Sequence, residues 1–228
     1  MWCMIARMDT APGDGLLLPL AFTRDDESSD DRFYVVPRKV VHIDDGAIAA
    51  LGELYAEILP AGGRLLDLMS SWRSHLPPGF RAGTVVGLGL NAEEMADNPQ
   101  LGSHVVHDVN RDPRLPFGDA EFDGAMCAVS IQYVIHPVLL LREVRRALRP
   151  GAPFVVSFSN RCFPTKAVAV WLDTTDQQHA RLVRAYFETA GGWVDVKDED
   201  RSPGPGDPLY AVWARASSGT IDARLLTP

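Results

Sequence analysis

The sequence predicts a doubly wound α/β domain with a mostly parallel, seven-stranded sheet that closes in an antiparallel hairpin. Three observations support this fold: short apolar runs, helical stretches between them, and two final strands with no helix between. The five apolar runs span 64–68, 84–87, 104–107, 122–129 and 152–158. Most of them are apolar on both faces, as parallel strands covered on both sides require.

Helical patterns precede and separate the runs. Asp44-Asp45 opens a helix whose apolar stripe continues to Leu59, and Pro60 ends it. Further helices are predicted at 92–96, 137–148 and 175–190. Strand and helix thus alternate, and this order predicts right-handed crossovers between parallel strands.

The end of the chain follows another pattern. Two strands, 193–196 and 209–213, are separated by the Pro/Gly loop 202–206, and no helix fits between them. They are therefore expected to pair as a hairpin. We expect one domain at 32–216, a flexible arm at 1–31 and a frayed tail at 217–228. The acidic run at 24–31 is typical of a solvated linker.

Composition excludes several classes of function. The 228 residues fit one domain, and a net charge of −8 argues against nucleic acid as a partner. Cys3, Cys127 and Cys162 lie far apart, which predicts reduced thiols with no zinc site, and Cys127 as buried filler. No apolar segment is long enough for a membrane span, and no signal peptide is evident, so a cytoplasmic protein without membrane partners is expected. Nothing in the sequence indicates an oligomeric state.

The candidate site follows from the fold. In an open parallel sheet, ligands bind beyond the carboxyl ends of the strands, near the switch in strand order. Polar residues follow each of the five runs: Asp67, Ser70 and Ser71; Asn91; Asp108; Ser130, Tyr133 and His136; Asn160 and Arg161. They predict one pocket for a polar small molecule.

A family resemblance appears between Asp108 and residue 158. Leu115-Pro116-Phe117 and Phe122-Asp123 precede Arg146-Ala147-Leu148-Arg149-Pro150-Gly151. This order resembles class I S-adenosylmethionine-dependent methyltransferases, in particular the type 11 group, over roughly residues 40–215. The resemblance implies a Rossmann-like methyltransferase fold, S-adenosyl-L-methionine as cofactor, and methyl transfer. The stretch 66–72 resembles a subgroup with an atypical first loop.

Two features depart from the family pattern. The first loop usually carries three glycines, whereas this chain has Met69, Ser71 and Arg73 at those places. Glycine permits positive φ there, so a different turn is expected. The family usually ends its second strand with an acid that binds the ribose. Gly89 stands at that place, and Asn91 is the nearest polar replacement.

Carried over position by position, the resemblance implies a set of cofactor contacts. In this set, Asp108 would accept a hydrogen bond from the adenine amino group, with the N–H of Val109 near the ring. Ser130 would lie beside the sulfonium, and Asp67 would anchor the first loop. The complete expected set is Asp67, Met69, Ser70, Ser71, Gly87, Gly89, Asn91, Asp108, Val109 and Ser130.

The acceptor is expected to be a small molecule that the sequence does not name. If the reaction needs a base, the candidates are His75 and His136, with Tyr133 orienting the acceptor, and a structural role competes for each. Expected substrate contacts are Tyr34, Arg38, Trp72, Asn160 and Arg161. Tyr34 and Arg38 precede the core on a segment that often forms a lid in this family. Arg38 is expected to pair with the cofactor carboxylate or with an anionic acceptor, and a surface role competes.

Two other functions stay open. One is a non-catalytic relative with altered or lost cofactor binding, because the loop glycines and the ribose acid are missing. The other is an NAD(P)-dependent oxidoreductase, because residues 87–92 match Gly-x-Gly-x-x-Ala and Asp108 lies where a ribose-binding acid would stand. The four arginines between 142 and 149 are interpreted as a solvated face.

Overall fold

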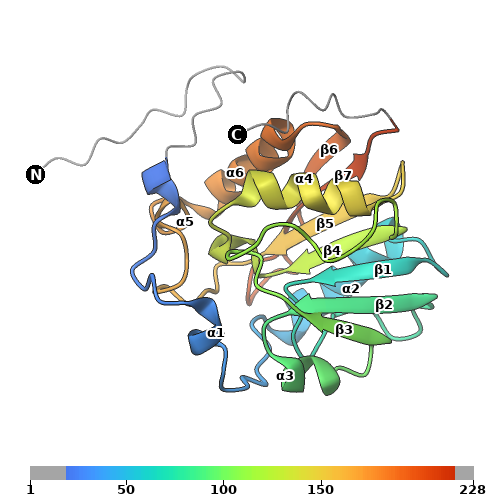
Figure 1. Cartoon of the computed structure of the whole chain (residues 1–228), viewed down its shortest axis with the longest axis horizontal. Coiled ribbons are helices and arrows are strands. Elements are labelled where there is room, and N and C mark those ends of the chain that lie inside the picture. Colours follow the sequence, from blue (N-terminus) through green and yellow to red (C-terminus); the bar gives the residue numbers. More distant parts are fainter. Residues whose placement is uncertain (1–18, 219–228) are drawn as a thin grey trace, which may run out of the picture.

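A seven-stranded sheet lies between two layers of helices in the computed structural model, which describes residues 19–218 (Figure 1). The strand order is β3-β2-β1-β4-β5-β7-β6, and β1 to β5 are parallel. The strands are β1 (Arg64–Leu68), β2 (Thr84–Gly89), β3 (Ser103–Val106), β4 (Gly124–Ala128), β5 (Pro153–Phe158), β6 (Trp193–Asp200) and β7 (Tyr210–Ala216). The predicted doubly wound sheet is confirmed, and so is its closing hairpin, in which β7 runs antiparallel to both β5 and β6.

The helices alternate with the strands as the sequence predicts, with small shifts at their ends. They are α1 (Asp30–Phe33), α2 (Asp45–Ile58), α3 (Ala92–Ala96), α4 (Pro137–Ala147), α5 (Ala169–Leu172) and α6 (Asp176–Ala190), with short 3₁₀ turns η1 (Pro19–Phe22) and η2 (Ile131–Tyr133). Residues 1–18 of the expected arm and 219–228 of the expected tail lie outside the described residues. None of the helices within the described range is long and apolar enough to cross a bilayer.

Alternation along the strands divides the core into two layers, because successive side chains point to opposite faces of a sheet. Leu65 and Met126 pack in the cluster formed with α2 on one face. Leu66 and Cys127 pack in the cluster formed with α4 and α6 on the other. Figure 1 shows α4 and α6 in front of the sheet and α2 behind it. Cys127 is fully buried, as predicted for a filler residue.

The connection from β1 to β2 contains no helix. Residues 69–83 form a loop instead, with Pro77-Pro78-Gly79 near its middle. Leu76 from this loop is buried in the cluster with α2, and Phe80 packs against that cluster. The loop therefore covers part of the sheet face that a helix would otherwise occupy, while its first half stays near the carboxyl ends of the strands.

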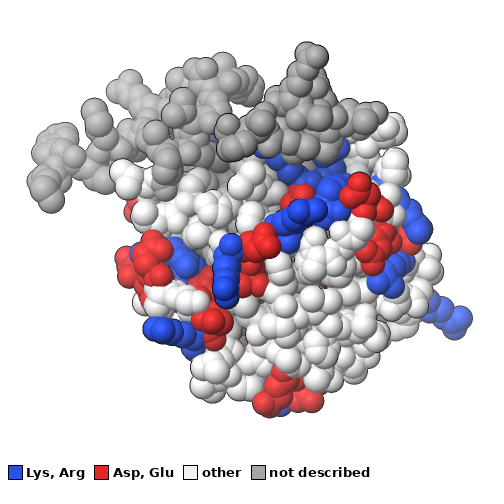
Figure 2. Space-filling model, in the orientation of Figure 1, with Lys and Arg blue, Asp and Glu red and all other residues white. Residues whose placement is uncertain are grey.

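The arginines of α4 correct the prediction of a solvated face. Arg145 is buried, and Arg146 donates to the carbonyls of Leu115 and Phe117 as well as to Glu143. Arg146 therefore holds the loop before β4 onto the helix. On the face shown in Figure 2, acidic side chains lie among the basic ones along α4, so no continuous basic surface forms there.

The segment of residues 23–42, here called the strap, runs across the carboxyl ends of the strands. Figure 1 shows it in blue, with α1 beside the ends of the sheet. Backbone bonds from Asp26 N–H to Thr165 and from Ala169 N–H to Thr23 fix its beginning. At Asp30 the acidic run departs from the solvated linker that the sequence predicts, because this residue is only 4% exposed, whereas Asp25, Glu27 and Asp31 are exposed. The charge of Asp30 is compensated by Arg24 in the same run and by Lys166, whose distance in the sequence hides it from a local charge pattern.

Candidate functional site

A cleft opens beneath the strap at the carboxyl ends of β1, β2, β3 and β4. Its empty space, including the open mouth, is about 1050 Å³. Asp67 near the end of β1, Asn91 after β2 and Asp108 after β3 all line it. The fold therefore brings these three predicted residues to one place, at the switch in strand order between β1 and β4.

Most of the other predicted site residues line the same cleft. They are Tyr34, Arg38, Met69, Ser70, Ser71, Trp72, His75, Gly89, Val109, Ser130 and Tyr133. Gly87, His136, Asn160 and Arg161 do not line it. Gly87 lies within β2 and His136 is the exposed N-cap of α4. Asn160 is exposed, and Arg161 pairs with Asp207 at 2.8 Å beside a separate shallow hollow.

Asp67 anchors the loop that follows β1. It is 3% exposed, and one carboxylate oxygen accepts hydrogen bonds from the hydroxyls of Ser70 and Ser74, each at 2.6 Å. Burial raises the pKa of Asp67 to about 6, and the two serine hydrogen bonds oppose that rise. The loop after β1 is thus held by a carboxylate that ionises close to neutral pH.

The turn after β1 keeps part of the conformation expected of a glycine-rich loop. Met69, at the first glycine place, has φ of 57° although it is not glycine, and an ordinary side chain is strained in that region. The sequence-based expectation of a different turn is therefore wrong at this residue. A backbone hydrogen bond from Ser70 N–H to Leu88 at 2.8 Å holds the loop against β2.

The same loop explains the glycine at the end of β2. A Cβ atom on Gly89 would collide with the carbonyl oxygen of Ser70 and press on the sulfur of Met95. An acidic side chain does not fit at position 89 while the loop lies there. Asn91 does not replace it freely, because its Oδ1 accepts from Glu94 N–H and its Nδ2 donates to the carbonyl of Tyr34.

Glu94 is a functional candidate that the sequence reasoning missed. It lies in α3 and is 6% exposed, yet its carboxylate lines the cleft. One oxygen accepts from the backbone N–H of Arg38 at 2.5 Å and the other from the hydroxyl of Ser71 at 2.6 Å. Sequence offers one weak signal, an acid in the first turn of the helix after β2, but such acids usually just complement the helix dipole.

Asp108 and Asn110 shape the wall of the cleft after β3. One oxygen of Asp108 accepts from the N–H groups of Asn110 and Arg111 at 2.9 and 3.3 Å. The amide of Asn110 donates to Asp30 in the strap and to the carbonyl of Tyr133. In the described part of the chain, the second oxygen of Asp108 has no hydrogen-bond donor, so it is available to a ligand.

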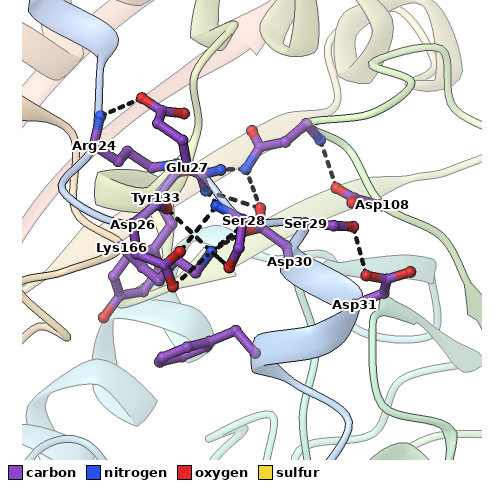
Figure 3. A network of polar contacts seen from close by, with 12 residues as sticks. Arg24, Asp26, Glu27, Ser28, Ser29, Asp30, Asp31, Asp108, Tyr133 and Lys166 are labelled. Carbon is purple, nitrogen blue, oxygen red and sulfur yellow. Dashed lines mark hydrogen bonds and ion pairs between the residues drawn. The ribbon is translucent and has the colours of Figure 1, made fainter.

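The strap is fixed by an ion-pair network beside the cleft. Figure 3 shows Arg24, Asp26, Asp30 and Lys166 converging on one another. The Lys166 ammonium is fully buried, lies 3.2 Å from both Asp26 and Asp30, and donates to the carbonyl of Ser28 at 2.6 Å. Arg24 pairs with Asp30 at 2.8 Å. Because Lys166 follows β5, the network joins the first described residues to the middle of the fold.

The histidine and tyrosine candidates have perturbed acidities. Burial, then the nearby charges of His42 and Arg73, lowers the pKa of His75 to about 4. Its imidazole is thus neutral at pH 7 but a weaker base than free histidine. Burial raises the pKa of Tyr133 to about 12, and its hydroxyl accepts from the N–H of Phe163 at 2.9 Å. Tyr133 therefore stays protonated and retains one hydrogen to donate.

A family comparison agrees with this geometry. Residues 73–156 match the family described as a methyltransferase domain. A chain of the complex between the Haloferax volcanii Trm112 methyltransferase activator and a methyltransferase superposes with a TM-score of 0.59 at 16% identity, covering 77% of this chain and 92% of that one. An S-adenosylmethionine-dependent methyltransferase from Mesorhizobium loti gives 0.50 at 20% identity, covering 73% and 97%. The chain has the class I methyltransferase fold.

Proteins with this methyltransferase fold differ in the reaction named for them. The cyclase SpnF superposes with a TM-score of 0.55 at 17% identity, covering 83% of this chain and 92% of that one. No curated protein sequence matches the chain. The methyltransferase fold therefore identifies the architecture and the place of the site, while the reaction has to be argued from the residues in the cleft.

Proposed function

We propose that the protein is an S-adenosylmethionine-dependent methyltransferase that acts on a small-molecule acceptor. The observation that carries this proposal is the single cleft that joins Asp67, Glu94 and Asp108 beneath the strap. Asp67 lies near the end of β1, Glu94 in α3 after β2, and Asp108 in the turn after β3, so their polar groups are spread along the cleft as an elongated ligand with several polar groups requires. The match of residues 73–156 to a methyltransferase domain supports the same reading.

The residues present fit a nucleoside with an amino-acid tail. The free oxygen of Asp108 suits an exocyclic amino group. Glu94 suits a ribose, since a carboxylate offers about four acceptor positions and only two are used by Arg38 and Ser71. It would thus replace the acid that position 89 has no room for. The loop around Met69 and Ser70 lies where the amino-acid tail would rest.

The chain's part in methyl transfer is alignment and exclusion of water. The bound cofactor supplies a methyl group already activated on a sulfonium. The strap, tied through Arg38 and Tyr34 to α3, covers the cleft and keeps water from it. Tyr133 has a protonated hydroxyl with which to orient an acceptor. His75 serves as a base only for an acceptor that gives up its proton easily, because its own pKa is low.

The structure opposes the oxidoreductase alternative. Gly87 and Gly89 lie inside β2 and pair with β3, so they do not form a phosphate-binding turn between strand and helix. The helix that follows, α3, has only five residues. A dinucleotide pyrophosphate therefore lacks the glycine turn and the long helix on which that motif depends.

Calorimetry with S-adenosylmethionine, S-adenosylhomocysteine and NADH tests the proposal. We expect both sulfur compounds to bind and NADH not to bind. Glu94→Gln and Asp108→Asn should each lower the affinity for S-adenosylhomocysteine about ten-fold or more, as expected for lost hydrogen bonds to charged groups. The exposed neighbours Glu93→Gln and Asp112→Asn are the matched controls. If neither sulfur compound binds, the result favours the non-catalytic relative. If only NADH binds, it favours the oxidoreductase.

A further inference from the structure

Arg38 brings a positive charge into the cleft from the strap. Its backbone N–H is bound to Glu94, and its guanidinium Nη1 donates to the carbonyl of Phe33 at 2.5 Å. Within residues 19–218, no carboxylate forms an ion pair with this guanidinium, and none of its nitrogens is buried without a partner. Its remaining N–H groups are therefore accessible to a ligand in the cleft that they line.

Other cations around the strap contrast with Arg38. Four of them have a carboxylate partner: Arg24 with Asp30, Lys39 with Asp97, Arg161 with Asp207, and Lys166 with Asp26 and Asp30. A planar guanidinium is the side chain best suited to bind a carboxylate through two parallel hydrogen bonds. A half-buried guanidinium without such a partner inside a ligand cleft therefore points to an anionic ligand.

Aromatic rings surround this guanidinium. Its central carbon lies 4.2 Å from the ring centroid of Phe33, 5.7 Å from that of Phe163 and 5.8 Å from that of Tyr34. Phe163 in turn stacks near Tyr133 at 6.1 Å and meets the ring of His42 at 5.3 Å. A ligand that reaches Arg38 is thus in contact with flat apolar surfaces, which favour a flat apolar body.

We propose that Arg38 is the carboxylate subsite for the acceptor, which is a flat, aromatic carboxylic acid. The acceptor is favoured over the cofactor's own carboxylate because Phe163 belongs to the loop after β5, whereas the cofactor candidates follow β1 to β4. The role of the bound acid as methyl acceptor rests on the proposed function. Binding of the acid at Arg38 does not.

The test is calorimetry of the full chain with 4-hydroxybenzoate and its neutral amide, 4-hydroxybenzamide, with and without saturating S-adenosylhomocysteine. We expect the acid to bind at least ten-fold more tightly than the amide. Arg38→Gln should abolish that preference and Arg38→Lys should keep part of it, because charge-assisted hydrogen bonds are stronger than neutral ones. Acetate should bind at least ten-fold more weakly than 4-hydroxybenzoate, since it lacks the ring.

Arg73→Gln is the matched control. Arg73 also lines the cleft without an ion pair in the described chain, but it is exposed and its guanidinium lies 3.8 Å from the neighbouring Trp72 ring centroid. Its loss should change 4-hydroxybenzoate affinity less than three-fold. The bond between the backbone of Arg38 and Glu94 survives every side-chain change at 38, so thermal unfolding of the Arg38 variants should stay close to that of the parent.

Three results would overturn the assignment. One is equal binding of the acid and the amide by the parent chain, and another is equal binding of acetate and 4-hydroxybenzoate. The third is an Arg38→Gln variant that loses S-adenosylhomocysteine affinity while retaining that for 5′-methylthioadenosine, which lacks the amino-acid tail. By contrast, acid binding that depends on Arg38 without any binding of S-adenosylhomocysteine would refute the proposed function and support the subsite.

Discussion

Gly89 shows how the backbone of a neighbouring loop can exclude a side chain at one position. Its missing Cβ leaves room for the backbone of Ser70, and backbone cannot yield as a flexible side chain can. We predict that Gly89→Ala lowers the unfolding free energy by about 1–3 kcal/mol, the usual cost of overpacking. The same substitution should lower the affinity for S-adenosylhomocysteine, because it displaces the loop. Urea unfolding and calorimetry measure the two effects.

Two other glycines provide comparisons for this prediction. At Gly87 the new Cβ meets chiefly the end of the Leu101 side chain, which can move, so Gly87→Ala should cost less. At Gly118 the nearest atom is 3.6 Å away, so Gly118→Ala should change stability by under about 1 kcal/mol. Equal losses at 87 and 89 would show that the loop is not packed as described.

Asp67 makes stability depend on pH in the direction opposite to most carboxylates. Its pKa is raised from 3.8 to about 6 by burial, so its contribution is full below pH 4 and is lost as the pH rises through 6. Asn cannot ionise, so we predict that the unfolding free energy of Asp67→Asn rises relative to that of the parent by about 3 kcal/mol from pH 4 to pH 7. Urea unfolding across this range measures the difference. The exposed Asp25→Asn is the control, and a pH-independent difference at Asp67 would contradict the prediction.

At the scale of elements, Asp44 connects the start of α2 to the loop between β6 and β7. One carboxylate oxygen caps the helix by accepting from Ala47 N–H at 2.9 Å, and the other accepts from Asp207 N–H at 2.8 Å. We predict that Asp44→Ala costs about 2–3 kcal/mol, one cap plus one further hydrogen bond, measured by urea unfolding. Asp45→Ala, at the exposed next position, should cost under about 1 kcal/mol. Similar losses at both positions would mean that the second contact is unimportant.

Elements were predictable where a repeating pattern determined them, and less so where a distant partner did. The strand β1 and the helix α3 have the predicted bounds because local apolar spacing and an N-cap decide them. The burial of Glu94 was not predictable, since it depends on the strap lying over α3. Nor was the burial of Asp30, whose partner Lys166 stands 136 positions further along. Asp67 and Asp108 could be predicted to share one cleft, which they line, because strand ends indicate where a pocket lies even without knowledge of the loops.

For the whole molecule, Lys166 ties the strap to the segment that follows β5. Its loss would leave Asp26 without an ion pair and Asp30 with Arg24 alone, so Lys166→Met should cost about 2–4 kcal/mol. Lys39→Met also removes a lysine with two acidic partners, but an exposed one, and should cost about 0–1 kcal/mol. Unfolding free energies and amide hydrogen exchange across residues 23–42 measure the two variants.

A rescue experiment separates charge from packing in this network. If uncompensated charge causes the loss, the double variant Lys166→Met with Asp26→Asn should recover part of it, because the carboxylate that loses its ion-pair partner is then neutral, while Asp30 keeps Arg24. Failure to recover, together with equal hydrogen exchange in the Lys166 and Lys39 variants, would mean that the strap is held by its backbone contacts instead.

The network of Lys166 also has a consequence for synthesis on the ribosome. The strap emerges before its partner, because Lys166 follows 140 residues after Asp26, and Asp44 likewise precedes Asp207 by 163 residues. Until those partners are translated, the acids of the strap remain hydrated and the cleft has no cover. Such long separations slow folding, so we expect the mouth of the site to form only after those partners are made, although its cover is translated before them.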